Sequence, residues 1–573
     1  MTRGRAWLGR LGRERNRYAT GAAAAKLEAL AALAPVRLRR PRDLVEFHGH
    51  LLFLRAFPDD ERVRLAAVAA LEAFARRVRG LPARALATLE DSGLAGSTSR
   101  HAFEAPVARW LADRFGASVE LDWRAMPDSS GIDFLLGLVT GRAEQDGLES
   151  ERLTTRQWLR RAKGAERISD LAWLLRELRG RRATRPLWQA LYDDAGVPLA
   201  WRLRDGAGAA ARNVLPVAAV HYRGRGLRRL PADPRRLIAA PLAGITLLDA
   251  KRAEAVIDVT RAALTARCRE VYAISYANPQ EVYLADLGAG TTLALLGVLP
   301  ARRLSLESNY GYLLLSNGVP VGYAGVTPLY RQANTGINIF EPFRGSEAGF
   351  LCAQTLRAFH TLFGVERFVL NPYQIGAGNS EAIASGAFWF YYRLGFRPVA
   401  AELAALAAAE HRRQLGSSGR RTDARTLRRL AQSDVELVLP GARRRDRFAE
   451  TWLAELSLLA SERLARDAGG DGRERGAERL ATRVARSLGV RRLASWPEAE
   501  RAAFVALAPL VALLELGSLD ASSRAGLVRL MRAKGAAQEA PYVRAAAADR
   551  HLLPGLMAAA RRAGSARARA QAT

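Results

Sequence analysis

The spacing of hydrophobic residues predicts helices over the first and last parts of the chain. Apolar residues recur every three or four positions in 59–78 and 155–178, which is the period of one helical face. Residues 502–514 are almost entirely apolar, as expected of a buried helix. We therefore expect a helical N-terminal domain of unknown role at 1–210 and a helical C-terminal region at 401–573.

Between residues 211 and 400 the pattern changes to short alternating or β-branched runs, which are typical of strands. These runs are 217–222, 281–287, 291–299, 311–315 and 320–329. Asn317-Gly318 lies between the last two runs, and both residues tolerate positive φ, so an antiparallel hairpin is predicted there. This stretch is therefore expected to be an α/β domain.

Residues 337–398 follow the order strand, loop, helix, strand, helix. The strand INIF at 337–340 leads into a loop of small residues at 344–349, and this loop opens a helix predicted to end at Phe363. Such a loop at a helix N-terminus leaves backbone N–H groups free to bind an anion, and Arg344 adds a positive charge. The pattern predicts a site for a phosphorylated cofactor.

A second strand and a second helix complete this segment. The strand is predicted at Arg367–Leu370, and the helix begins near Asn379 and ends at Gly395. A strand–helix–strand unit crosses over to a parallel neighbour. Gly336–Phe340 is therefore expected to lie parallel to Arg367–Leu370.

The basic composition changes this picture little. The formal net charge is +30, but only four of the 87 basic residues are lysine, and the arginines are interleaved with acidic residues along the chain. The densest cluster, Arg443–Arg445 with Arg447, is interpreted as a solvated face because basic runs are weak motifs. Nucleic-acid binding is not expected.

Membrane insertion and metal binding are not expected either. No apolar run approaches the ~20 residues that span a bilayer, and the N-terminus has no continuous apolar segment of a secretory signal. A cytoplasmic location is therefore predicted. His48 and His50 lack a third ligand, and Cys268 and Cys352 cannot form a metal site alone, so structural roles are favoured.

The hairpin, the strand INIF, the loop FRGSEAG and the helix end FYYRLGF together resemble the GNAT superfamily of N-acetyltransferases, over residues 255–400. In that superfamily an Arg/Gln-x-x-Gly-x-Gly/Ala loop binds the pyrophosphate of acetyl-coenzyme A. The pantetheine arm lies between two splayed parallel strands, and a later helix ends in Tyr-x-x-x-Gly-Phe. The resemblance implies an α/β fold whose central, acetyltransferase-like mixed sheet is flanked by helical N- and C-terminal regions.

The resemblance also implies acyl transfer from acetyl-coenzyme A or another acyl-coenzyme A to the amine of a small molecule or a protein. Tyr391 would protonate the departing thiolate, and backbone N–H groups of Gly336–Phe340 would polarise the thioester carbonyl. Glu341 directly follows the strand and is a candidate general base. The cofactor-binding residues would be Ile339, Phe340, Arg344, Gly345, Ser346, Ala348, Gly349 and Asn379.

Two further hypotheses arise from the same region. Glu347 stands where the superfamily has its middle glycine, and a carboxylate there would itself fill the anion site at the helix N-terminus. The protein would then be a catalytically inactive scaffold whose helical flanks bind a protein partner. Residues 286–291 resemble the first glycine loop of S-adenosylmethionine methyltransferases, although a strand–turn–strand is favoured there.

Overall fold

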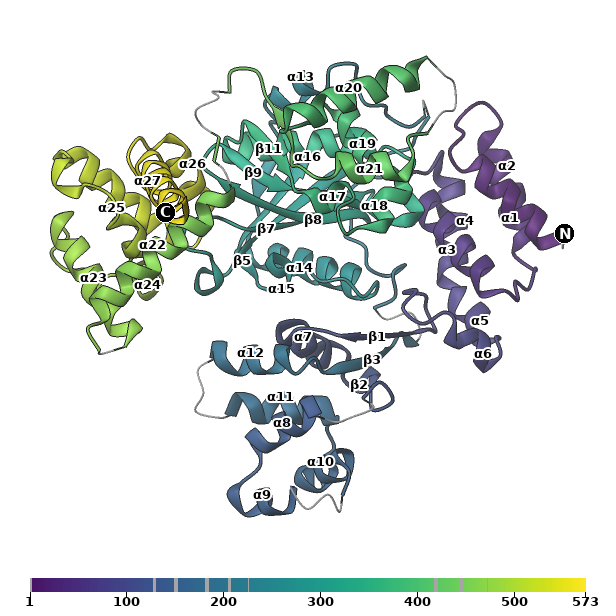
Figure 1. Ribbon diagram of the computed structural model, residues 1–573. Coiled ribbons are helices and arrows are strands. Elements are labelled where there is room, and N and C mark those ends of the chain that lie inside the picture. The colour runs from purple at the N-terminus through teal and green to yellow at the C-terminus, as the bar shows by residue number, and fades with distance from the viewer. Residues whose placement is uncertain are drawn as a thin grey trace.

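The structure is a computed structural model that describes residues 3–126, 130–148, 153–180, 185–204, 208–224, 226–416, 421–442, 447–448, 450–470 and 472–572. Over these residues the fold is mixed α/β, with a ten-stranded, mostly antiparallel sheet at the centre and helical regions at both ends of the chain (Figure 1). The predicted fold class is confirmed at this level. Three of the four arginines in the predicted basic cluster, Arg443–Arg445, lie outside the described residues.

The N-terminal region consists of two parts. The first contains α1 (Arg3–Glu14), α2 (Ala22–Leu33), α3 (Pro41–Ala56), α4 (Glu61–Glu72), α5 (Phe74–Arg79) and α6 (Ala83–Ala87). These helices share a hydrophobic cluster with the central sheet. The second part has its own cluster and contains an antiparallel sheet in addition to helices. Its elements are β1 (Thr98–Ala102), α7 (Ala105–Phe115), β2 (Val119–Leu121), α8 (Ser130–Val139), α9 (Arg142–Leu148), α10 (Thr155–Lys163), α11 (Asp170–Gly180), α12 (Arg185–Asp194) and β3 (Pro198–Arg202).

The central sheet has the order β12-β13-β11-β9-β8-β7-β6-β5-β4, with β10 also paired to β8. Its strands are β4 (Ile245–Leu247), β5 (Ala277–Asp286), β6 (Thr291–Val298), β7 (Tyr310–Ser316), β8 (Val319–Leu329), β9 (Gln332–Thr335), β10 (Asn338–Ile339), β11 (Arg367–Leu370), β12 (Arg397–Pro398) and β13 (Val435–Val438). The predicted hairpin is confirmed: β7 and β8 pair antiparallel, and Asn317 and Gly318 turn the chain with φ of 47° and 74°.

Two features of this sheet differ from the sequence analysis. Residues 217–222 form no strand, because their backbone is held by the hairpin turn instead of by a sheet edge. The side chain of Asn317 accepts a hydrogen bond from His221 N at 2.8 Å and donates one to His221 O at 3.0 Å. In addition, β13 lies beyond residue 400, yet it fills the position between β11 and β12.

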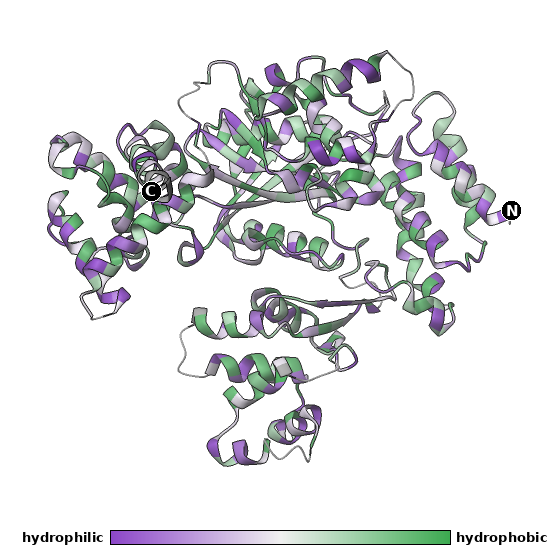
Figure 2. Ribbon diagram, in the orientation of Figure 1, coloured by the Kyte–Doolittle hydropathy of each residue, from purple (hydrophilic) through white to green (hydrophobic). Residues whose placement is uncertain are grey.

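Helices cover both faces of the sheet (Figure 1). One face carries α14 (Ala250–Thr265) and α15 (Tyr272–Ser275), and the other carries α16 (Ala348–Phe363), α17 (Pro372–Ile375), α18 (Ser380–Ser385) and α19 (Ala387–Leu394). The Tyr312 ring packs on Phe359 of α16 with centroids 5.5 Å apart. Figure 2 shows that the sheet strands are largely hydrophobic, whereas the helices mix hydrophobic and hydrophilic residues. This mixture is expected of helices that bury only one face. The remaining central helices are α13 (Pro234–Ala239), α20 (Ala401–Leu415) and α21 (Ala424–Leu430).

The C-terminal helices dock on one end of the sheet through a buried ionic cluster. They are α22 (Glu450–Ala468), α23 (Arg473–Ser487), α24 (Glu498–Val511), α25 (Ala521–Gly535), α26 (Ala540–Ala548) and α27 (Leu552–Ala572). Lys534 and Glu539 from these helices meet Glu281 and Arg303 of the central domain, and all four side chains are at most 2% exposed. Among the helices that the structure describes, none is long and apolar enough to cross a membrane.

Candidate functional site

A large cleft lies where two neighbouring strands separate. Strands β9 and β10 both pair with β8 in one continuous register, since Thr335 is opposite Val326 and Asn338 is opposite Tyr323. They are the two halves of one strand that is interrupted at Gly336 and Ile337. Because β11 lies parallel to β9 only, the second half diverges from β11.

The predicted pairing of Gly336–Phe340 with Arg367–Leu370 is therefore wrong. The parallel partner of β11 is β9, beginning with Arg367 opposite Gln332, and β10 is antiparallel to β8. The crossover through α16 does return the chain to a parallel neighbour, as expected of a strand–helix–strand unit. The pairing begins at Gln332, four positions before the predicted start at Gly336. Beyond the residues of β9 that pair with β11, the two strands separate and the cleft opens.

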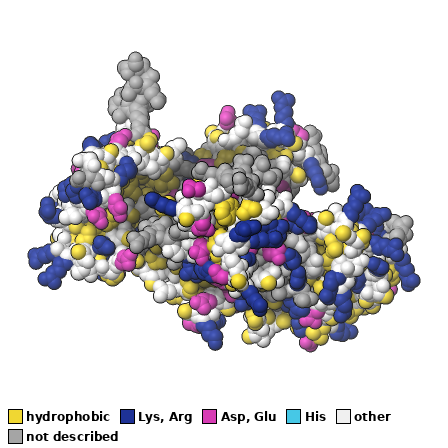
Figure 3. All heavy atoms as spheres, turned by 90° about the horizontal axis from the view of Figure 1, so that it is seen from below, with side chains coloured by type: hydrophobic (Ala, Val, Ile, Leu, Met, Phe, Trp, Pro, Cys, Tyr) yellow, Lys and Arg dark blue, Asp and Glu magenta, His cyan; other side chains and the backbone are white. Residues whose placement is uncertain are grey.

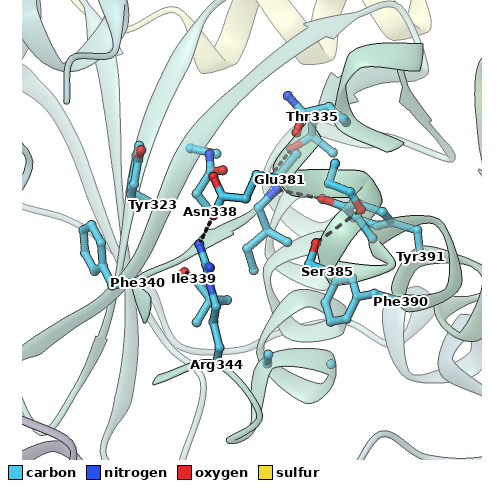
Figure 4. A pocket seen from close by; sticks show the side chains of 18 of the residues that line it. Tyr323, Thr335, Asn338, Ile339, Phe340, Arg344, Glu381, Ser385, Phe390 and Tyr391 are labelled. Atoms are coloured by element: carbon cyan, nitrogen blue, oxygen red, sulfur yellow. Dashed lines mark hydrogen bonds and ion pairs between the residues drawn. The ribbon is translucent and has the colours of Figure 1, made fainter. Parts of the chain in front are cut away.

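The cleft has a volume of about 1470 Å³ and is lined by residues from several separate segments. It reaches from the loop before α16, past the break in the strand, to the loop that follows α14. Figure 4 shows Tyr323 and Phe340 on one side, Phe390 and Tyr391 on the other, and Arg344 and Glu381 between them. Each of the ten residues predicted to form a catalytic or cofactor-binding site lines this cleft: Ile339, Phe340, Glu341, Arg344, Gly345, Ser346, Ala348, Gly349, Asn379 and Tyr391.

The N-terminus of α16 presents free donors to the cleft. Within the part of the chain that the structure describes, the backbone N–H groups of residues 347–350 donate to no protein group, and the first helical bond runs from Leu351 N to Glu347 O at 2.9 Å. Unpaired N–H groups at the start of a helix attract anions. Gly345 precedes them with φ of 78°, a conformation that glycine adopts without strain.

Glu347 does not fill this anion site. Its buried carboxylate makes no cap on the helix and instead pairs with Arg228 at 2.6 Å and Arg223 at 3.3 Å. Arg228 also donates to Thr291 Oγ1 at 2.7 Å, so the group joins the start of α16 to the turn between β5 and β6. Two guanidinium groups against one carboxylate leave a net positive charge beside the free N–H groups.

Arg344 lies at the mouth of the cleft. Its guanidinium pairs with Glu381 of α18 at 2.6 Å, and the two side chains are 53% and 62% exposed. An ion pair this exposed contributes little to stability, typically ~0–1 kcal/mol. Arg344 can therefore exchange this partner for a bound anion at small cost.

Tyr391 reaches the cleft at the break in the strand. Its hydroxyl accepts a hydrogen bond from Ile337 N at 3.2 Å, and burial, aided by the neighbouring Cys352, raises the pKa of the hydroxyl well above its ordinary value. The group is consequently a protonated donor at neutral pH. The predicted helix that carries it is divided in two, because Gly386 is left-handed with φ of 68° between α18 and α19.

The backbone of residues 336–340 is only partly free. Phe340 N donates to Val321 O at 3.0 Å, and Ile337 N is taken by Tyr391, so neither matches the predicted role of polarising a substrate carbonyl. Antiparallel pairs alternate between hydrogen-bonded and non-bonded positions. This alternation leaves Ile339 N–H pointing away from β8, towards the cleft.

Glu341 and Asn379 occupy more ordinary positions. Glu341 is exposed on a 3₁₀ turn at Glu341–Phe343. Asn379 caps α18, since its side chain accepts from Ala382 N at 3.0 Å and donates to Tyr373 O at 3.2 Å. Both line the cleft, but the amide of Asn379 is already engaged with its own loop.

One wall of the cleft, contributed by the loop after α14, was not predicted from the sequence. Arg267, Arg269 and Glu270 line the cleft although they precede β10 by about seventy positions. No spacing pattern marks them, because they face the cleft only through the tertiary fold. Tyr323 of β8, also missed, stacks on Phe340 with ring centroids 5.2 Å apart.

Glu270 turns its carboxyl group towards the second N-terminal part. One oxygen accepts from Glu104 N at 3.1 Å, and the other is buried without a hydrogen-bond partner among the described residues. Burial, together with the carboxylates of Glu104 and Asp193, raises the pKa of Glu270 to about 7. The folded state therefore binds this proton more tightly than the unfolded chain does.

This raised pKa gives a pH-dependent prediction. The stabilisation from protonated Glu270 is complete below its ordinary pKa and is lost as pH rises through about 7. Glu270→Gln should raise the free energy of unfolding by about 1–2 kcal/mol at pH 8, after allowance for partial solvent contact, and by little at pH 5. Urea unfolding at the two pH values measures this, and an equal change at both would contradict it.

Residues 286–291, His48 and His50 do not line the cleft. Residues 286–291 form the turn between β5 and β6, as the strand–turn–strand interpretation predicted. His48 and His50 are buried on α3, where burial lowers their pKa values to about 3 and about 4. Within the described ranges, no group of three or more histidine, cysteine, aspartate or glutamate side chains could hold a metal ion.

Comparisons with known proteins add no family to this geometry. No protein-family model matches the sequence, and no similar protein was found among curated proteins or solved structures.

Proposed function

We propose that this protein is an acyl-coenzyme A-dependent acyltransferase that acylates an amine. The observation that carries the proposal is the position of the Tyr391 hydroxyl, which meets Ile337 N at the point where two strands diverge. The free N–H groups at the start of α16 line the same cleft. A proton donor, an anion site and an open channel between strands are the parts that this chemistry needs.

In this proposal the donor's pyrophosphate binds the N–H groups of residues 347–350, with Arg344 and Arg228 supplying charge. The acyl carbonyl lies near Ile339 N–H, which faces the cleft. The acceptor nitrogen forms a bond to the carbonyl carbon as the carbon–sulfur bond breaks. Tyr391 gives its proton to the departing sulfur, and the proton that the amine loses returns through water to the Tyr391 phenolate.

The binding step has a direct test in a matched pair of variants. Arg344→Ala should weaken acetyl-coenzyme A binding by about 1.5 kcal/mol, roughly tenfold, because one charged hydrogen bond is lost. Glu381→Gln should tighten binding, because it frees Arg344 from its surface partner. Isothermal titration calorimetry on the full chain measures both, and changes in the same direction would contradict the assignment of Arg344.

The inactive-scaffold hypothesis makes a different prediction. It requires Glu347 to occupy the anion site, whereas its carboxylate lies against Arg223 and Arg228. Calorimetry that detects no acyl-coenzyme A binding to the unmodified protein would nonetheless favour a scaffold whose helical flanks bind a partner protein.

Nucleic-acid binding has less support. Figure 3 shows lysine and arginine side chains dispersed over one face of the molecule, with acidic side chains among them, and no single basic stripe. A continuous basic surface is the usual footprint of nucleic-acid binding.

A further inference from the structure

The cleft has a second charged wall, formed by Arg267 and Arg269 on the side opposite α16. Side chains alternate between the faces of a strand. Phe340 and Tyr323 therefore lie on the face that carries α14, whereas Ile337 and Ile339 lie on the face that carries α16. The Arg267 guanidinium stacks over the Phe340 ring at 4.1 Å from its centroid.

These two arginines have no acidic partner among the described residues. The Arg267 side chain donates from Nη1 to Ala263 O at 2.6 Å. Arg269 is exposed. The neighbouring carboxylate of Glu381 is already paired with Arg344 at 2.6 Å, and that of Glu270 is bonded to Glu104 N.

Tyr323 marks the place where the positive charges converge. Burial raises the pKa of the Tyr323 hydroxyl; the charges of Arg269, Arg267 and Arg344 each oppose that rise, and the carboxylate of Glu381 adds to it. Burial also lowers the pKa of Arg267 to about 10. A desolvated cation without a counter-charge is costly, and an anionic ligand would remove that cost.

The loop that holds the two arginines is fixed in a strained conformation. Cys268, between them, has φ of 52°, a left-handed conformation that costs a residue other than glycine about 1–2 kcal/mol. Arg269 N donates to Leu264 O at 3.1 Å and Cys268 N to Thr265 O at 3.0 Å, which closes the end of α14. Both arginines are thereby held against the cleft wall.

We infer that this wall binds an oxyanion on the acceptor, so that the acceptor is an amine that also carries a carboxylate or phosphate group. The inference rests on the proposed acyltransferase function. Arginine forms paired hydrogen bonds with either anion. Asn338 is opposite Tyr323 in the sheet and directly follows Ile337, so the bound anion would hold the amine beside the Tyr391 hydroxyl.

Binding of matched acceptors to the full chain without acyl-coenzyme A tests the anion site. The probes are β-alanine and O-phosphoethanolamine, and their counterparts β-alaninamide and ethanolamine, in which a neutral amide or hydroxyl replaces the acid group; all are titrated by calorimetry. At least one acid should bind about tenfold or more tightly than its neutral counterpart, as expected for a charged hydrogen bond. The acid that binds more tightly shows whether the site prefers a carboxylate or a phosphate group.

Substitutions then locate the site. Arg267→Gln and Arg269→Gln should each abolish most of the preference for the acid. Arg252→Gln, which removes an exposed arginine from the other end of α14, should keep it. Arg269 is exposed, so its variant tests the site even if Arg267→Gln does not fold.

The outcomes separate this inference from the proposed function. Equal binding of acids and neutral amines, no binding of either, or a preference that survives in both variants overturns the anion site, whether or not acetyl-coenzyme A binds. A preference that is lost in the variants supports the anion site. If acetyl-coenzyme A fails to bind in the same preparation, the acyltransferase function falls while the anion site stands.

Discussion

Tyr391→Phe should slow acyl transfer by about 100-fold, the lower end of the range for loss of a general acid. The ring stays buried beside Phe396, whose centroid lies 5.7 Å away, so packing is retained. Binding of acetyl-coenzyme A should not change, because the free N–H groups of α16 are untouched. Steady-state kinetics should therefore show a lower kcat with an unaltered KM for the donor.

Tyr392→Phe is the matched control for this prediction. Tyr392 is the next residue of α19 and is also buried, but one step along a helix turns its side chain by about 100°. Its ring contacts Arg397 and His411 instead of the strand break. Equal kcat values for the two variants would remove Tyr391 from the chemical step and leave the fold unaffected.

Arg303→Met should lower the free energy of unfolding by about 3–5 kcal/mol, the usual cost of removing one partner from a buried ion pair. Arg303 Nη2 bonds Glu281 Oε2 at 3.2 Å, and Nη1 bonds Ala536 O at 2.6 Å. Its loss leaves Glu281 and several carbonyl groups without this donor between the sheet and the C-terminal helices. Urea unfolding followed by circular dichroism gives the change.

The control for Arg303 is an exposed pair of the same residue types. Arg202 on β3 pairs with Glu120 at 2.5 Å, but their side chains are 38% and 47% exposed. Arg202→Met should cost no more than about 1 kcal/mol. If the two variants lose the same stability, the buried cluster does not hold the C-terminal helices to the sheet.

Local signals in the sequence predicted the parts of the site that depend on local geometry. Asn317-Gly318 specified the hairpin, because few residue pairs tolerate two positive φ values. Gly364 ends α16 with φ of 71°, and Asn379 caps α18, both as expected of their residue types.

The parts that depend on distant contacts were not predictable in the same way. The register between β9 and β11 depends on where the chain re-enters the sheet after α16. The predicted pairing of β11 was therefore four residues away from the observed one, which begins at Gln332. The strand Val435–Val438 is short and follows a long helical stretch, and its place in the sheet depends on β11 and β12. Arg267 and Arg269 carry no motif and reach the cleft only because α14 ends beside it.

The tip of the β7–β8 hairpin has a consequence for synthesis of the chain. Ser316 Oγ and Asn317 Nδ2 donate to Ala56 O at 2.8 and 3.0 Å, across 260 and 261 residues of sequence. Helix α3 therefore lacks these partners until more than half of the protein has left the ribosome. Because contacts so distant in sequence form slowly, and domains otherwise fold in order of synthesis, the N-terminal helices should reach their final packing only after the central sheet has formed.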